Sequence, residues 1–233
     1  DVAKAANNLS QRSDRKLGKD VIRLGQIIPP LEAKNAFDNA NIKTDEYIAK
    51  QNQVQKALRA SLTAMGLGNI NLDFKPIIAP SGQRPEDAVA SGSVAEGVYF
   101  NKTIALAMEI YDPNLSEAEL QQRLGSVMNH EVIHALFEMG VFTQQEQQVL
   151  VNAAKNRKYV QIIDGTPVER KYTYLDRANR MYQKKSDGTS YTPEEQMEEA
   201  IAELYRDFAD GKIKLGGKPK TLWIKSTSTQ DWI

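Results

Sequence analysis

The sequence between residues 116 and 140 reads SEAELQQRLGSVMNHEVIHALFEMG, and it predicts one long helix. Ser116 followed by Glu119 three residues later is typical of a capping box at a helix start. Gly140 is typical of a helix end. Apolar side chains recur between them at helical spacing: Leu120, Leu124, Val127, Met128, Val132, Ile133 and Leu136.

Both histidines of the chain lie inside this predicted helix, in His130-Glu131-Val132-Ile133-His134. Side chains four residues apart project from the same helical face, so the two imidazoles can reach one metal ion. Glu131 is turned by about 100° from His130, which suits a base acting on metal-bound water. The alternative is an ordinary pair of core or surface histidines, but burying two imidazoles without partners in so apolar a helix is costly.

A catalytic zinc ion takes three protein ligands and one water. The chain has no cysteine and no further histidine, so the third ligand has to be a carboxylate. The best candidates are Glu199 and Glu203, which lie four residues apart on one face of a predicted helix, opposite its apolar stripe. Carboxylates in that position can also be merely solvated. Asp176 is the one rival for the third ligand.

Composition excludes several classes of protein. The 233 residues carry 30 basic and 30 acidic side chains and no cysteine, so nothing indicates a disulfide framework or a global attraction to nucleic acid. No apolar run is long enough for a membrane-spanning helix. Residues 78–149 hold three basic and ten acidic side chains, a net charge of −7, and a cation is best placed there. The chain starts at Asp1 without a signal-peptide pattern, so we expect a piece of a longer polypeptide.

The remaining patterns predict helices, then short strands, then helices again. Helices are expected at 44–66, 143–157 and 192–208, and a strand at 70–74. Gly97–Phe100 and Ile104–Met108 flank Asn101-Lys102-Thr103 and predict a hairpin. This order favours an α+β fold that is rich in helix, with a small and mostly antiparallel sheet.

The motif His130-Glu131-Val132-Ile133-His134, followed by Glu199-Ala200-Ile201-Ala202-Glu203, resembles the zincin metallopeptidases, specifically the gluzincin branch. The resemblance implies a zincin-like fold with an active-site helix and a second, glutamate-bearing helix. It implies a zinc ion held by His130, His134 and Glu199, with Glu131 as the general base. Glu203 would accept a hydrogen bond from His130 or His134.

The resemblance also implies that the segment before the active-site helix is an edge strand that pairs with an extended peptide substrate. This segment consists of Ile104, Ala105, Leu106, Ala107 and Met108. The chain departs from the family in three ways. The separation of 65 residues between His134 and Glu199 is long, the second acid is Glu rather than Asp, and no third histidine can steady an oxyanion. Arginine or one of five tyrosines would have to do so: Tyr172, Tyr174, Tyr182, Tyr191 or Tyr205.

The expected function is therefore zinc-dependent hydrolysis of peptide bonds. The expected substrate is a peptide or protein, and the parent polypeptide of this chain is one candidate. A looser similarity links the chain to zincin-like domains of large phage and mobile-element proteins. A structural or delivery domain with little or no catalysis is the alternative, and a zinc-dependent amidase is a third. No membrane is expected as a partner, because no apolar run is long enough to span one. Nucleic acid is not expected either, because the cluster Arg177, Arg180, Lys184 and Lys185 is typical of a solvated helix face.

We expect three parts in the chain: an arm or linker helices at 1–44, the zincin-like domain at 45–215, and an extension at 216–233. The cellular location is left open, with the virion and the cytoplasm as candidates.

Overall fold

The computed structural model describes residues 45–75, 77–79, 84–91, 94–108, 110–185, 189–219 and 221. The predicted N-terminal arm and most of the predicted C-terminal extension lie outside these residues, so the three-part division stays a prediction. The described residues divide into two compact units, the first up to Glu131 and the second from Val132 onward. Each unit is described by itself below.

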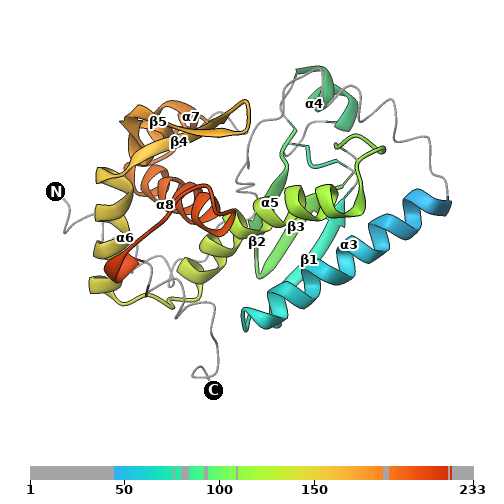
Figure 1. Ribbon diagram of the computed structural model, residues 1–233, viewed down its shortest axis with the longest axis horizontal. Coiled ribbons are helices and arrows are strands. Elements are labelled where there is room, and N and C mark those ends of the chain that lie inside the picture. Colours follow the sequence, from blue (N-terminus) through green and yellow to red (C-terminus); the bar gives the residue numbers. More distant parts are fainter. Residues whose placement is uncertain are drawn as a thin grey trace. The chain divides into compact units, whose positions relative to one another are not determined.

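Within the first unit the described elements are α3 (Asp45–Ala64), β1 (Asn71–Lys75), α4 (Pro85–Ser91), β2 (Gly97–Phe100), β3 (Thr103–Ala107) and the first part of α5 (Glu117–Glu138) (Figure 1). The second unit holds the rest of α5, then α6 (Gln144–Asn156), β4 (Lys158–Ile163), β5 (Thr166–Thr173), α7 (Tyr174–Met181) and α8 (Pro193–Ala209). Helices combined with small sheets of three and two strands confirm the α+β class.

The three strands of the first unit form a sheet in the order β1-β3-β2. β2 and β3 are antiparallel and form the predicted hairpin. Its turn residues Asn101 and Lys102 have φ angles of 48° and 57°. A two-residue turn with both residues in the left-handed region matches the twist of antiparallel strands, and this explains the short connection between β2 and β3.

The prediction that Ile104–Met108 is an edge strand was wrong. β3 is the central strand, because β1 pairs with it in parallel on one side and β2 pairs with it on the other. Ile104 faces Leu72 of β1 and Tyr99 of β2, and Met108 lies beyond the end of the strand. The sequence did not reveal the parallel pair because its strands are joined by a long crossover and not by a recognisable turn. The edges of the described sheet are β1 and β2.

Helix α3 buries a stripe that consists of Val54, Leu58 and Leu62. It is attached to β1 by Arg59, whose guanidinium donates to the carbonyl of Leu72 and lies over the ring of Phe74. The helix therefore runs alongside β1, as Figure 1 shows.

Helix α5 begins with the predicted capping box. The hydroxyl of Ser116 accepts from the backbone N–H of Glu119 at 3.2 Å, and the Glu119 carboxylate accepts from the N–H of Ser116 at 2.9 Å. Gly140 ends the helical segment with a φ of 67°. The apolar neighbours of the histidines are all buried, which confirms the expected environment.

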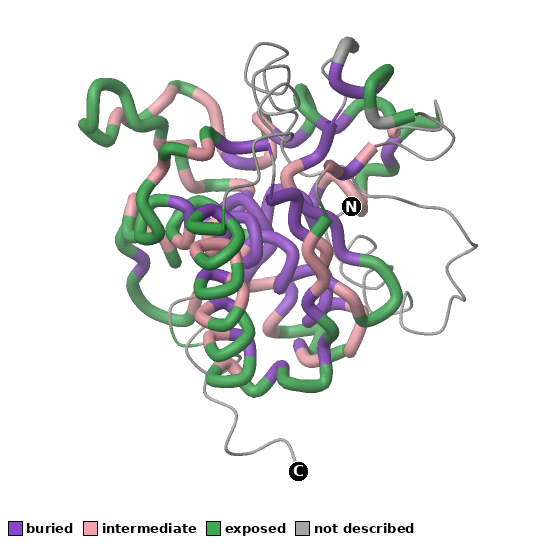
Figure 2. The backbone as a smooth tube through the Cα atoms, turned by 90° about the vertical axis from the view of Figure 1, so that its right-hand side faces the viewer, coloured by how far each residue is buried: buried purple, intermediate pink, exposed green. Residues whose placement is uncertain are grey.

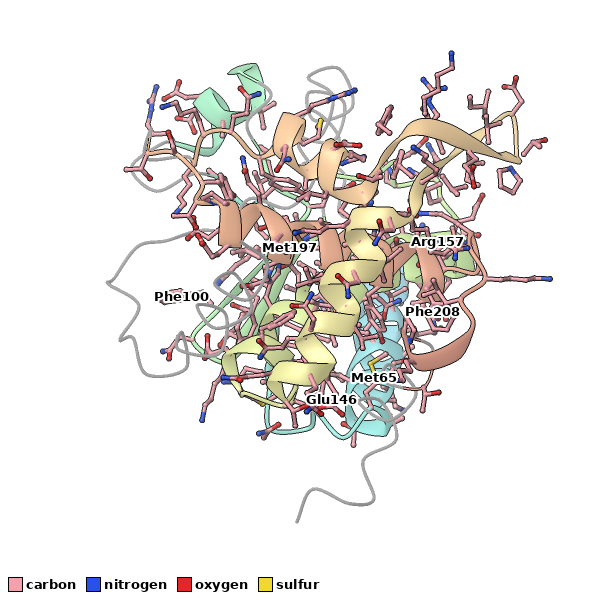
Figure 3. The ribbon with its side chains drawn as sticks, turned by 90° about the vertical axis from the view of Figure 1, so that its left-hand side faces the viewer. Met65, Phe100, Glu146, Arg157, Met197 and Phe208 are labelled. Atoms are coloured by element: carbon pink, nitrogen blue, oxygen red, sulfur yellow. The ribbon has the colours of Figure 1, made fainter. Side chains whose placement is uncertain are left out.

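Helices α6 and α8 of the second unit begin with the predicted capping boxes at Thr143 and Thr192. Figure 3 shows α6 crossing α8, whose first half is marked by Met197 and whose end is marked by Phe208. Every residue of α8 from Met197 to Asp207 is buried. Figure 2 shows continuously buried stretches of backbone and, beside them, helices in which buried and exposed residues alternate. The predicted polar face opposite the apolar stripe of α8 is therefore not a solvated face.

The hairpin of β4 and β5 and helix α4 were not predicted, and α7 was expected only as the helix face that carries Arg177 and Arg180. The hairpin has a clear signal, because Asp164 and Gly165 form its turn with φ angles of 49° and 74°, and Asp-Gly is a preferred pair in such turns. For α7 the signal is a capping box formed by Thr173 and Asp176. Among the helices in the described part of the chain, none combines the length and the apolar character that crossing a membrane requires.

Gly97 of β2 packs closely against α5. A Cβ atom at this position would lie 2.5 Å from Cγ1 of Val127 and 3.3 Å from Cδ2 of Leu106. We expect Gly97→Ala to lower the free energy of unfolding by about 1–3 kcal/mol, because the buried neighbours have to move. Urea unfolding followed by circular dichroism measures the change.

Gly125→Ala is the matched control. A Cβ atom at Gly125, inside α5, would lie 3.5 Å from Cδ2 of Leu58, an ordinary contact. The free energy of unfolding of this variant should rise by about 0.5–1 kcal/mol, because alanine is more favourable than glycine in a helix interior. Equal stability of Gly97→Ala and the wild type would contradict the close packing of β2 on α5.

Candidate metal centre

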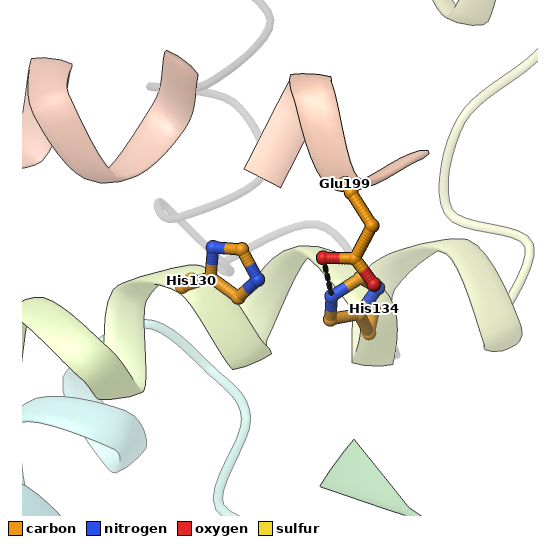
Figure 4. A group of neighbouring side chains, drawn as sticks. All are labelled: His130, His134 and Glu199. Carbon is orange, nitrogen blue, oxygen red and sulfur yellow. Dashed lines mark ion pairs between the residues drawn. The ribbon is translucent and has the colours of Figure 1, made fainter. Parts of the chain in front are cut away.

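Three buried side chains come together as a possible metal site: His130, His134 and Glu199. Each offers one ligand atom, and these atoms all lie within 4.8 Å of one another. Figure 4 shows the carboxylate of Glu199 directed toward the imidazoles. These are the three residues that the sequence predicted as ligands, and the group could hold a metal ion.

Two different features position these side chains. His130 and His134 lie one turn apart on the continuous helix α5, so the helix geometry alone puts both imidazoles on one face. Glu199 belongs to α8, and its Oε2 lies 3.6 Å from Nε2 of His134. Both side chains are almost completely shielded from solvent, at 1% and 2% exposure.

Glu198 fixes the orientation of the His134 ring. Its Oε1 lies 2.7 Å from Nδ1 of His134, and both side chains are buried. A proton held at Nδ1 by this carboxylate leaves Nε2 to face Glu199. Metal-binding histidines are typically held in this way, with one ring nitrogen donating to a carboxylate and the other facing the ion.

Glu203 was predicted to accept a hydrogen bond from His130 or His134. For His134 this was wrong, because the carboxylate at its Nδ1 belongs to Glu198. Glu203 instead accepts from the hydroxyl of Tyr182 at 3.0 Å and from the guanidinium groups of Arg177 and Arg206 at 3.3 and 2.6 Å. For His130 the predicted hydrogen bond with Glu203 stays a prediction. Glu203 is therefore bound into a network of its own, one helical turn beyond Glu199.

The charges around His134 favour a cation. Burial by itself lowers the pKa of His134, but the carboxylates of Glu199 and Glu198 outweigh it and raise that pKa to about 10. The two carboxylates therefore favour a positive charge at His134. A metal ion would supply the same positive charge from the position facing Nε2.

Glu131, the predicted base, is also buried, with 1% exposure. Its Cγ lies 3.4 Å from the position that a Cβ atom of Gly97 would take. The same Cβ position would also lie close to Val127, which precedes Glu131 by four residues on α5. The Glu131 side chain therefore lies against the start of β2, on a different face of α5 from the histidines.

Asp176, the rival third ligand, has a different role. Its carboxylate accepts from the backbone N–H of Thr173 and completes the capping box of α7, and its side chain is exposed. The backbone hydrogen bond from Thr173 lowers the pKa of Asp176.

Two of the five tyrosines considered for an oxyanion donate to buried carboxylates. The hydroxyl of Tyr174 donates to Asp207 at 2.9 Å, and that of Tyr182 donates to Glu203. Burial, followed by the charges of Glu203 and Glu199, raises the pKa of Tyr182 well above its ordinary value. Tyr182 therefore keeps its proton, and its hydroxyl is directed to Glu203.

The sequence did not single out Glu198 or Arg177. Glu198 could have been found, because a ligating histidine needs a partner for its second nitrogen and a carboxylate stands beside the third ligand. Arg177 had no local signal, since its partner Glu203 is 26 residues away. Its assignment to a solvated helix face was wrong, because its side chain is only 14% exposed.

Comparisons of the chain with protein-family models, with curated proteins and with solved structures found no match. The case for the site therefore depends on its residues and their geometry.

We expect Glu198→Ala to lower the affinity for zinc by roughly 10–100-fold, the range typical of losing a carboxylate behind a ligating histidine. The physical reason is that Nδ1 of His134 loses its acceptor and the ring its fixed orientation. Competition with a chromophoric chelator measures the affinity. Glu194→Ala, near the start of the same helix, is the control and should stay near the wild-type value. An unchanged affinity in Glu198→Ala would contradict the orienting role.

Proposed function

We propose that this protein binds zinc through His130, His134 and Glu199 and hydrolyses peptide bonds. The observation that carries the proposal is the buried cluster of these three side chains beside Glu131 of the same helix. The zincin resemblance of the two motifs supports the same reading.

Zinc is proposed because the ligand set and the spacing suit it. Two imidazoles and one carboxylate are a common catalytic zinc set, with a fourth position left for water. Ligands placed tetrahedrally at zinc–nitrogen and zinc–oxygen bond lengths are about 3.3–3.5 Å apart. The distance of 3.6 Å between Nε2 of His134 and Oε2 of Glu199 is close to this ligand-to-ligand separation, and it is too long for a good hydrogen bond.

Each residue then has a distinct role. Zinc, when bound, would lower the pKa of a water molecule and polarise the carbonyl of the substrate. Glu131 takes the proton of the attacking water and passes it to the leaving amine. Glu198 keeps the ring of His134 oriented. Burial of Glu131 keeps bulk water away from its carboxylate, which suits a group that has to exchange a proton with the reactants.

The substrate is proposed to pair with β2 and not with β3. β2 is an edge strand of the described sheet, and a Cβ atom on its first residue, Gly97, would lie 3.4 Å from Cγ of Glu131. An extended peptide that adds to an open sheet edge is held by its backbone, so it can be recognised over several residues. A peptide on β2 would pass close to the base.

The first test is the metal itself. Purified protein loaded with zinc and freed of excess ion should carry one zinc per chain by elemental analysis. Glu199→Ala should lose the ion or hold it far more weakly, because only two protein ligands remain. Glu195→Ala, one turn earlier on α8, is the control and should retain it. A wild type without zinc, or full retention in Glu199→Ala, would refute the site.

The second test is the base. Glu131→Gln should lower hydrolysis of a casein or peptide-library substrate by roughly 10²–10⁴-fold, because the amide cannot take up the proton. Zinc content and the thermal midpoint should stay near those of the wild type, since glutamine is nearly the same size. Zinc binding without any hydrolysis by the wild type would favour the alternative, a zincin scaffold that serves as a structural or delivery domain.

A further inference from the structure

Glu203 is the centre of a second buried cluster on α8, which we call the guanidinium clamp: Glu203, Arg177, Arg206 and Tyr182. The carboxylate is 1% exposed. Oε1 accepts from Arg177 and Tyr182, and Oε2 accepts from Arg206. A carboxylate buried this deeply is stable only when such donors compensate its charge.

The members of the clamp differ in what they connect. Arg206 lies three residues after Glu203 on the same helix, so this ion pair cannot fix α8 against any other element. Arg177 lies on α7 and Tyr182 directly follows α7, so these two attach α8 to its neighbour. Helices α7 and α8 are in extensive contact.

The β4–β5 hairpin holds Arg177 in place. Its guanidinium carbon lies 4.8 Å from the centre of the Tyr159 ring, and Tyr159 stacks on Tyr172 of β5. Arg180 lies 4.8 Å from the centre of the Tyr172 ring, so two arginines one turn apart flank two stacked rings. Arg177 is the one of these two arginines that is found to bind Glu203.

We propose that Arg177 is a positioning residue for the metal site. Glu199 and Glu203 lie one turn apart on the same face of α8, so a rotation of α8 about its axis moves both carboxylates together. By holding Glu203, Arg177 holds the rotation at which Glu199 meets Nε2 of His134. The inference depends on the proposed metal site but not on hydrolysis.

If the role of Arg177 were purely electrostatic, its removal would change the zinc affinity in the opposite direction. Removal of a nearby positive charge makes the surroundings of the site more negative, which attracts a dication more strongly. Loss of positioning lets Glu199 move from the ion, which weakens binding. The sign of the change in zinc affinity therefore decides between the two roles.

The experiment compares Arg177→Met with Arg180→Met in the full chain. Both variants replace an arginine over a tyrosine ring with an apolar chain of similar length, but only the first removes a bond to Glu203. Arg177→Met should weaken zinc binding roughly tenfold or more in chelator competition, at the low end of what loss of an outer-shell partner costs. It should also change the visible spectrum of the Co²⁺-substituted protein. Arg180→Met should leave both unchanged.

Two further variants keep the proposal open to refutation if Arg177→Met does not fold. Arg177→Lys keeps the charge but has a single ammonium, and should show a smaller loss of affinity. Tyr159→Leu removes the ring beneath Arg177 and should shift the affinity in the same direction. In folded protein, unchanged or tighter zinc binding by Arg177→Met, or equal losses in the two methionine variants, overturns the positioning role. Failure of the wild type to bind zinc instead overturns the metal site and the positioning role with it.

Discussion

A carboxylate removed from water has to be compensated by positive charge or by several hydrogen bonds, and this constraint organises the second unit. Helix α8 buries four carboxylates: Glu198, Glu199, Glu203 and Asp207. Glu198 and Glu199 face His134 of α5, Glu203 binds Arg177 of α7, and Asp207 binds Lys212 beyond the end of α8. Successive turns of α8 are therefore tied to different parts of the unit. The rotation of α8 about its axis, which decides where Glu199 points, follows from these pairs together.

Helix α5 contributes two faces to the site through its regular geometry. His130 and His134 are four residues apart and form one face, while Val127 and Glu131 are four residues apart and meet Gly97 of β2. Glu131 and the two imidazoles are thus held relative to one another by a helical backbone and not by a loop. A rigid element is the better support for groups that, in the proposed function, would meet at one ion and one substrate.

The predictions that succeeded have a local physical cause. Capping boxes at Ser116, Thr143 and Thr192 marked the helix starts, and the hairpin turn at Asn101 was flanked by recognisable strands. The edge-strand prediction for Ile104–Met108 failed because β1, about 30 residues earlier, pairs with β3 in parallel. That Glu198 and not Glu203 is the partner of His134 has a related reason: both residues are equally acidic, and only the packing of α8 decides which one reaches the ring.

The sequence by itself determined the longer helices, the one-turn spacing of the two imidazoles, and that a third ligand of the proposed metal site has to be a carboxylate in a chain without cysteine or further histidine. These follow from backbone periodicity and from the chemistry of the available side chains. The tertiary structure alone decided that Glu199 meets His134, that Glu198 holds its Nδ1, and that Arg177 binds Glu203. The physical reason is that these partners are 26 to 65 residues apart. Such contacts depend on how each helix is rotated against its neighbours, and that rotation is set by the packing and charge compensation of many side chains at once.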